Sequence, residues 1–228
     1  MFENKKDAIY LITDARGLDE ETFYARIEEA CRAGIDILQL REKEATTREL
    51  LEKGARMQQI AKEYGVPFVI DDRVDVALAL DTDGVHVGAD DLPVAMARKL
   101  LGPDKIVGAT AKTVEAARAA QKDGADYLGV GAIFATTTHD NPVRTSVDTL
   151  KDIVQAVDIG VLAIGGLTAD NVDVLRGTEA NGACVVRYLM QSEQVTKDVT
   201  RLRQALQTNE PNEHETDEKG RSRKSDLQ

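Results

Sequence analysis

The chain has 228 residues, of which 42% are hydrophobic and 30% are charged, as in ordinary globular proteins. Its net charge of −11 argues against nucleic acid as the main partner, because phosphate backbones are bound by basic surfaces. No apolar run approaches the roughly 18 residues of a membrane span, and residues 1–6 lead into no signal-peptide core. We therefore expect a cytoplasmic protein that does not contact membranes.

Short apolar runs alternate along the chain with longer stretches of helical periodicity. The expected strands are residues 8–14, 36–42, 67–72, 84–88, 105–110, 126–134, 160–166 and 183–189. The expected helices are residues 19–33, 46–64, 94–101, 113–123, 147–157, 169–176 and 192–207. Several helices begin at a capping residue and end near glycine, as Thr46 and Gly65 illustrate.

This alternation predicts a single α/β domain, a (β/α)₈ TIM barrel with parallel strands, over residues 1–207. The runner-up is an open doubly wound sheet, but the first turn lacks the glycine pattern of that fold. Residues 208–228 are densely charged and almost without aliphatic side chains, so we expect a disordered C-terminal tail. Cys31 and Cys184 lie far apart in apolar patterns, which predicts buried thiols rather than a disulfide or a zinc site.

Polar side chains gather at the ends of the expected strands, where barrels of this kind carry their active sites. Gln39, Arg41 and Lys43 alternate along the second strand, so they are expected on one face. A phosphate or diphosphate is the natural counter-charge for such cations. The alternative is that Arg41 and Lys43 pair only with the aspartates of the next strand.

Asp72 and Asp91 follow adjacent strands and are candidate ligands of one Mg²⁺, which binds one or two carboxylates together with substrate phosphates. Alternatively, Asp71 and Asp72 cap the helix that follows them. His86 lies within an apolar strand and is interpreted as a core or near-core histidine.

Two further segments suit an anion. The glycine pair Gly165–Gly166 precedes an expected helix, so its backbone N–H groups are predicted to approach a phosphate. Thr136 and Thr138 are placed at the end of the sixth strand as hydroxyl donors to a phosphate, the alternative being a polar turn.

At these residues the chain resembles the thiamine-phosphate synthase family, from about residue 10 to about residue 192. The resemblance is carried by the segments YLITD (residues 10–14), QLREK (39–43), 71–93, YLGVGAIFATTTHD (127–140) and AIGGL (163–167). It implies a barrel transferase that joins a pyrimidine diphosphate to a thiazole phosphate, with Mg²⁺ and release of diphosphate. Family members often self-associate, so a homo-oligomer is compatible with the resemblance.

The resemblance also implies roles for individual residues. Asp72 and Asp91 would bind the metal, and Arg41, Lys43 and Thr110 would act in catalysis. The pyrimidine diphosphate would be bound by Gln39, Leu40, Arg41, Glu42, Lys43, Asp71, Thr110 and His139. The thiazole phosphate would be bound by Thr136, Thr137, Thr138, Gly166, Val186 and Arg187.

Four of these positions depart from the family pattern: Asp71 stands for an asparagine, Thr110 for a serine, His139 for a lysine and Arg187 for a serine. We expect Arg187, together with Arg144, to replace the missing lysine charge, because guanidinium binds phosphate in a bidentate manner.

These four departures keep three alternative functions open. One is a related thiazole tautomerase, which uses a histidine where this chain has Ala132. The others are a divergent phosphate-binding barrel and a non-catalytic binding module.

Overall fold

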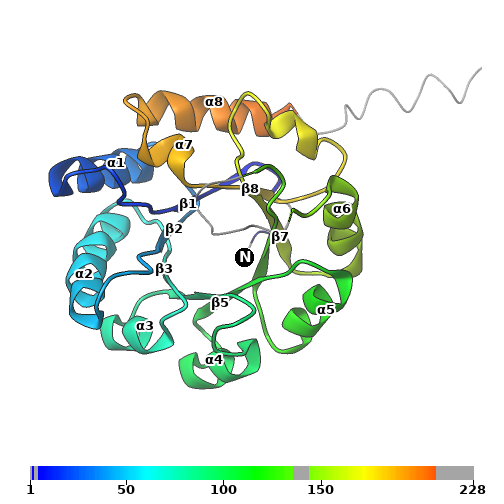
Figure 1. Ribbon diagram of the computed structural model, residues 1–228, viewed down its shortest axis with the longest axis horizontal. Coiled ribbons are helices and arrows are strands. Elements are labelled where there is room, and N and C mark those ends of the chain that lie inside the picture. The colour runs from blue at the N-terminus through cyan, green and yellow to red at the C-terminus, as the bar shows by residue number, and fades with distance from the viewer. Residues whose placement is uncertain (1, 3–4, 136–143, 209–228) are drawn as a thin grey trace, which may run out of the picture.

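The computed structural model describes residues 2, 5–135 and 144–208. Eight parallel strands pair in chain order, and β8 pairs with β1 to close the barrel. A ring of helices surrounds the strands (Figure 1). The prediction of a (β/α)₈ barrel is therefore confirmed.

The elements have the following bounds. The strands are β1 (Ala8–Ile12), β2 (Ile37–Leu40), β3 (Phe68–Asp71), β4 (Gly84–Val87), β5 (Ile106–Thr110), β6 (Tyr127–Val130), β7 (Gly160–Ile164) and β8 (Gly182–Val185). The helices are α1 (Glu20–Arg32), α2 (Thr47–Glu63), α3 (Val74–Leu80), α4 (Val94–Leu101), α5 (Val114–Lys122), α6 (Val147–Ala156), the 3₁₀ helix η1 (Val172–Leu175), α7 (Arg187–Met190) and α8 (Val195–Gln207).

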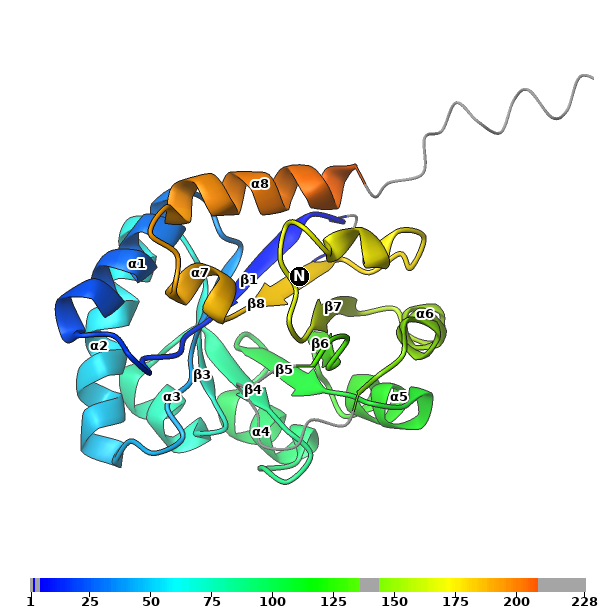
Figure 2. The same cartoon turned by 45° about the horizontal axis from the view of Figure 1, so that its top comes forward.

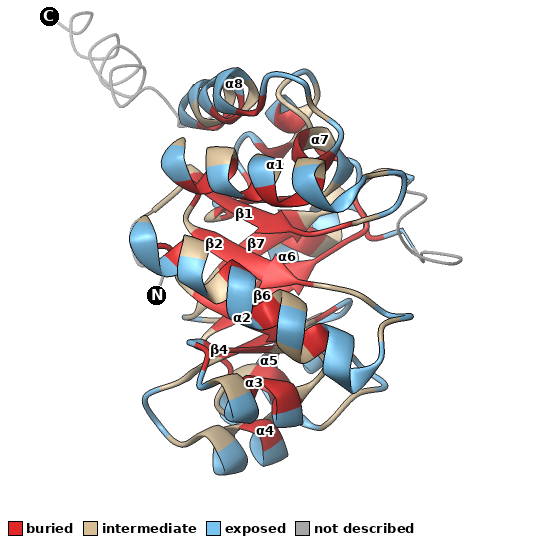
Figure 3. Ribbon diagram, turned by 90° about the vertical axis from the view of Figure 1, so that its left-hand side faces the viewer, coloured by how far each residue is buried: buried red, intermediate tan, exposed pale blue. Residues whose placement is uncertain are grey.

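The strands are buried on both faces, and the helices present their exposed sides to solvent (Figure 3). Alternate residues of β1 divide between two apolar layers: Ile9 and Leu11 pack toward the helices, whereas Ala8, Tyr10 and Ile12 fill the barrel interior. The tilted view shows the helices lying along the outside of the strands (Figure 2). Among the described helices, none combines the length and the apolar character that crossing a membrane requires.

Phe2 closes the end of the barrel at which the strands begin. Its ring meets Tyr127, the first residue of β6, edge-on at 5.9 Å between ring centroids. Asn181 donates a hydrogen bond of 2.9 Å to the Phe2 carbonyl. The opposite end, where the strands finish, therefore remains as the place for a site.

Several predicted ends shift by two or three residues, and three predicted elements differ more from the structure. The sixth strand ends at Val130 rather than at residue 134, although Ala132 and Ile133 stay buried. The helix predicted over residues 169–176 is the four-residue 3₁₀ helix η1. The eighth strand ends at Val185, and Arg187 begins the single turn α7 instead of lying on the strand. The tail prediction concerns residues that, apart from Thr208, lie outside the described part.

Candidate active site

Two cations lie just beyond the end of β2, in the loop that follows Leu40. The Arg41 backbone N–H donates to Thr13 Oγ1 at 3.0 Å, which fixes the start of this loop. Arg41 Nε lies 3.6 Å and Lys43 Nζ 3.4 Å from Asp71 Oδ2. Lys43 also forms an ion pair with Asp72. The predicted cations and carboxylates therefore converge, in the pairing that the sequence left as the alternative.

Asp71 ends β3 in an environment that opposes its charge. Its Oδ2 is buried and accepts no hydrogen bond of ordinary geometry within the described structure, although two cations lie within 4 Å. Burial raises the pKa of Asp71 to about 7, and the neighbouring charge of Asp72 adds to the rise. Burial opposes the charge on Lys43, but Asp71 and Asp72 outweigh it and raise the pKa of Lys43.

Asp72 adopts a left-handed backbone conformation, with φ of 59°, which is uncommon for a residue other than glycine. Its backbone N–H donates to the His86 carbonyl of the neighbouring strand at 2.8 Å. Asp71 and Asp72 make no side-chain cap for α3, whose N-terminal flank is Arg73. The capping alternative is therefore wrong for these two aspartates.

Asp91 reaches the same place from the loop after β4. Its Oδ2 accepts a hydrogen bond of 2.9 Å from the Gly88 N–H, and a Cβ atom at Gly88 would lie only 2.8 Å from that oxygen. Burial raises the pKa of Asp91, and a hydrogen bond shared with Asp72 raises it further. Asp72 and Asp91 are thus a close pair of carboxyl groups, and Lys43 forms an ion pair with Asp72.

This pair fits Mg²⁺ in the chemistry of its donors. Within the described residues, no group of three or more His, Cys, Asp or Glu side chains could hold a metal ion. A pair of carboxylates nonetheless suits Mg²⁺, which completes its octahedron with water and substrate phosphate oxygens. A bound cation would also offset the burial and the neighbouring Asp72 charge, which both raise the pKa of Asp91.

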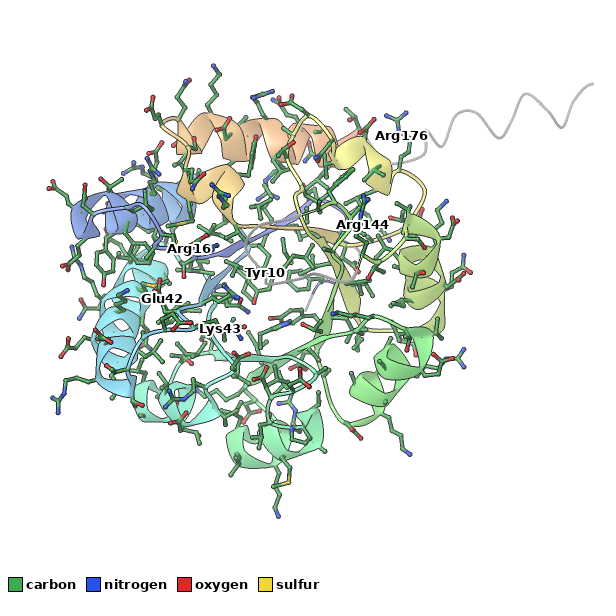
Figure 4. The ribbon with its side chains drawn as sticks, in the orientation of Figure 1. Tyr10, Arg16, Glu42, Lys43, Arg144 and Arg176 are labelled. Carbon is green, nitrogen blue, oxygen red and sulfur yellow. The ribbon has the colours of Figure 1, made fainter. Side chains whose placement is uncertain are left out.

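The other three residues of the QLREK segment do not direct their side chains toward Asp71 and Asp72. Gln39 is buried inside the barrel and donates to the Tyr10 hydroxyl at 2.8 Å. The Leu40 side chain is buried in the apolar layer between the strands and the helices, and its backbone pairs with Ile70 of β3. Glu42 pairs with Lys53 of α2 at 3.3 Å, and the labelled side chain lies on the α2 side of Lys43 (Figure 4).

His86 and Thr110 form the polar part of the interior below the carboxylates. His86 Nδ1 lies 3.1 Å from the Tyr127 hydroxyl, and Nε2 lies 3.0 Å from Thr110 Oγ1. Burial lowers the pKa of His86 to about 4, so the ring is neutral near pH 7. The interpretation of His86 as a satisfied near-core histidine agrees with these contacts.

The sequence reasoning missed Tyr10 and Tyr127, whose hydroxyls lie 2.8 Å apart inside the barrel. Burial raises the pKa of both phenols well above their ordinary value. Tyr10 occupies the same face of β1 as Ala8 and Ile12, so the period of two, applied to the first strand, could have placed it in the interior.

The loop after β7 contains the predicted glycine pair. Gly165 and Gly166 have φ of 110° and 63°, and a Cβ atom at Gly165 would lie 2.6 Å from Ala132 Cα. Gly166 is exposed, and its carbonyl accepts a hydrogen bond from Asn171 Nδ2 at 2.9 Å. Because η1 is a single 3₁₀ turn, the expected α-helix terminus does not add to this loop.

Three arginines follow the ends of β1, β6 and β8: Arg16, Arg144 and Arg187. Asp14, beyond β1, accepts hydrogen bonds from Arg16 Nε at 2.8 Å and Nη2 at 2.7 Å. These bonds lower the pKa of Asp14, and the nearby charge of Arg187 contributes to the decrease. Arg144 lies across the ring from Lys43 (Figure 4). Val186 packs against the interior layer beside Arg187.

Thr136, Thr137, Thr138 and His139 lie outside the described residues. Their assignment to the thiazole phosphate and to the diphosphate remains a prediction from the sequence.

Comparison with known proteins adds to this geometry. Residues 9–189 match the family model described as thiamine monophosphate synthase. "Thiamine-phosphate synthase 2" of Streptococcus pneumoniae serotype 4 is 52% identical over 187 residues, which cover 82% of this chain and 89% of the relative. "Thiamine-phosphate synthase" of Enterococcus faecalis is 48% identical over 198 residues, covering 87% and 93%.

A solved structure, the thiamine phosphate pyrophosphorylase from Pyrococcus furiosus, has a TM-score of 0.80 and 38% sequence identity. The match covers 91% of this chain and 98% of that one. A family match over most of the barrel and relatives this similar leave no ambiguity of membership: the chain belongs to the thiamine monophosphate synthase family.

Proposed function

We propose that the chain is a thiamine-phosphate synthase, a transferase that joins a pyrimidinylmethyl group to a phosphorylated thiazole. Its substrates are 4-amino-2-methyl-5-pyrimidinylmethyl diphosphate and 4-methyl-5-(2-phosphoethyl)thiazole, and its products are thiamine phosphate and diphosphate. The observation that supports this function most is the meeting of Arg41, Lys43, Asp72 and Asp91 at the ends of β2, β3 and β4.

The reaction breaks the bond between the methylene carbon and the diphosphate oxygen, and it forms a bond from that carbon to the thiazole nitrogen. The electron-rich aminopyrimidine stabilises positive charge on the methylene carbon, so the path is carbocation-like. No side-chain nucleophile is required. The protein therefore contributes charge stabilisation for the leaving group and alignment of the thiazole nitrogen.

Arg41 and Lys43 carry the charge stabilisation. Both contact Asp71, and Lys43 also pairs with Asp72, so each exchanges a carboxylate partner for diphosphate oxygens when substrate binds. Thr110 contributes a hydroxyl from the end of β5. His139 and Gln39 complete the pyrimidine diphosphate side.

Asp72 and Asp91 would hold Mg²⁺, which would supply charge neutralisation for the diphosphate. Gly166, Val186 and Arg187 form the thiazole phosphate side, with Thr136, Thr137 and Thr138 as hydroxyl donors. The tautomerase alternative finds no support, because Ala132 offers no group that transfers a proton.

The test is reconstitution. Purified protein, Mg²⁺ and the two substrates should yield thiamine phosphate and diphosphate in equal amounts. If the thiazole substrate were consumed or isomerised without release of diphosphate, the tautomerase alternative would replace this proposal. We expect the reaction to occur in the cytoplasm.

A further inference from the structure

A chain of hydrogen bonds crosses the interior of the barrel. Gln39 Nε2 donates to the Tyr10 hydroxyl at 2.8 Å, and the Tyr10 and Tyr127 hydroxyls lie 2.8 Å apart. The Tyr127 hydroxyl lies 3.1 Å from His86 Nδ1, and His86 Nε2 lies 3.0 Å from Thr110 Oγ1. Five strands thus contribute one side chain each to a continuous chain between two residues of the proposed substrate site.

The barrel makes room for this chain. Tyr10, labelled in Figure 4, lies near the middle of the ring and is 1% exposed, and Tyr127 is fully buried. Gly108 of β5 has no side chain, and a Cβ atom there would lie 2.1 Å from Tyr127 Cζ. Because buried hydroxyls are costly without partners, each proton in this chain needs an acceptor.

The chain has a direction. The Gln39 amide nitrogen can only donate, so the Tyr10 oxygen accepts from it. If Tyr10 donates to Tyr127, then Tyr127 donates to His86 Nδ1, and the neutral ring donates from Nε2 to Thr110. Both tyrosine hydroxyl protons and the histidine ring proton then have acceptors, and the Thr110 hydroxyl proton is left over at the end of β5.

The reverse direction fits the contacts less well. If Tyr127 donated to Tyr10, the Tyr10 oxygen would accept from both Gln39 and Tyr127, and the Tyr10 proton would have no acceptor among the described residues. The reverse direction becomes complete only if the Gln39 amide presents its oxygen to Tyr10 instead of its nitrogen.

We propose that Tyr10, Tyr127 and His86 are positioning residues that hold Thr110 as a hydrogen-bond acceptor from His86 and thereby direct its hydroxyl proton toward the pyrimidine diphosphate. The part about the substrate rests on the proposed function. The part about the direction rests on the contacts alone. A donated proton suits this substrate, because diphosphate oxygens and pyrimidine ring nitrogens are acceptors.

The direction is tested by ¹⁵N NMR of the histidine ring, which distinguishes a protonated nitrogen from an unprotonated one. The chain has three histidines, so the His139→Gln/His214→Gln variant isolates the signals of His86. We expect the proton on Nε2 and none on Nδ1 at pH 7.5. A proton on Nδ1 would overturn the proposal. Tyr10→Phe should leave the proton on Nε2, because Tyr127 can still donate to Nδ1.

The consequence for the substrate is tested by calorimetry with the pyrimidine diphosphate and Mg²⁺, without the thiazole. Tyr127→Phe should weaken binding about tenfold, as loss of one well-placed hydrogen bond does. Tyr24→Phe is the matched control, because Tyr24 is buried on α1, outside the chain of hydrogen bonds. The control should bind as the wild type does.

A double variant separates positioning from a merely structural effect. If Tyr127 acts through Thr110, Tyr127→Phe/Thr110→Val binds no more weakly than Thr110→Val alone, whereas additive losses would contradict the proposal. Thr110→Ser alone should bind the pyrimidine diphosphate as the wild type does, because serine retains the hydroxyl. If the wild type bound no pyrimidine diphosphate, the proposed function would fail, but the His86 measurement would still decide the direction of the chain.

Discussion

Lys43 Nζ, in the loop after β2, lies 3.4 Å from Asp71 Oδ2 at the end of β3. This contact crosses from one strand end to the next and joins a cation expected to bind diphosphate to a carboxyl group whose pKa burial raises to about 7. Arg41 Nε lies 3.6 Å from the same oxygen, so two cations expected to bind the diphosphate converge on one buried carboxyl group.

Removing the Lys43 charge should weaken catalysis. We expect Lys43→Ala to lower kcat/KM for the pyrimidine diphosphate by about 100-fold, in the range found when one donor to a developing anion is lost. Steady-state kinetics with the thiazole phosphate held at saturation measures this effect. Lys62→Ala, on the exposed end of α2, is the matched control and should keep the wild-type value.

Asp71 should make the stability of the ligand-free protein depend on pH. Its pKa in the folded protein is about 7, against 3.8 for the ordinary carboxyl group, so the folded state retains the proton longer than the unfolded state. The stability attached to this proton is present below pH 4 and is lost as pH rises through 7. Asp71→Asn should remove this loss, worth up to about 4 kcal/mol, since one pKa unit corresponds to about 1.4 kcal/mol.

Urea unfolding of the wild type and of Asp71→Asn, in EDTA between pH 4 and 8, measures the difference in their free energies of unfolding. We expect Asp71→Asn to gain stability relative to the wild type as pH rises. A constant difference across this range would show that Asp71 does not titrate there.

Loss of a carboxylate of the proposed Mg²⁺ site should be distinguishable from loss of a neighbouring carboxylate. Asp91→Asn removes a carboxylate that lies against Asp72, so the Mg²⁺ concentration for half-maximal activity should rise at least tenfold. Asp90→Asn, at the exposed residue just before it, should leave this concentration unchanged. Equal effects of both variants would indicate a general loss of negative charge rather than loss of a ligand.

Arg187 should serve the thiazole phosphate. We expect Arg187→Ala to raise KM for the thiazole phosphate about tenfold or more, because a guanidinium–phosphate contact is charge-assisted. Arg176→Ala is the matched control, because Arg176 is exposed and lies away from the ring interior, beside the end of α8 (Figure 4). Unchanged KM values for both substrates in Arg187→Ala would remove Arg187 from the site.

The sequence predicted the barrel because each strand is a short apolar run, as buried parallel strands require. It placed the ends of the sixth and eighth strands four residues too late, for a physical reason. Ala132 and Ile133 are buried after β6, where the Ile133 N–H still donates a hydrogen bond to the Ile164 carbonyl of β7 at 2.9 Å. Leu189 is buried in α7. Apolar character therefore continues beyond the residues that form regular strand. Burial and regular strand geometry are different properties, and the apolar pattern indicates only burial.

The sequence predicts those residues of the candidate site that lie close to the end of a strand. The structure brings together Arg41, Lys43, Asp72 and Asp91, which follow the ends of their strands within four residues. The interior hydrogen bonds could not be predicted in the same way. Tyr10 and Tyr127 lie 117 positions apart in the sequence, and a tyrosine within a strand reads as ordinary core.

The central claim is that Asp72 and its neighbours serve the release of diphosphate. The most direct measurement is the amount of thiamine phosphate and diphosphate formed from the two substrates with Mg²⁺ by the wild type and by Asp72→Asn. We predict equal amounts of both products from the wild type and at least a 100-fold lower rate from Asp72→Asn. No product from the wild type, or an Asp72→Asn variant as active as the wild type, would contradict this account.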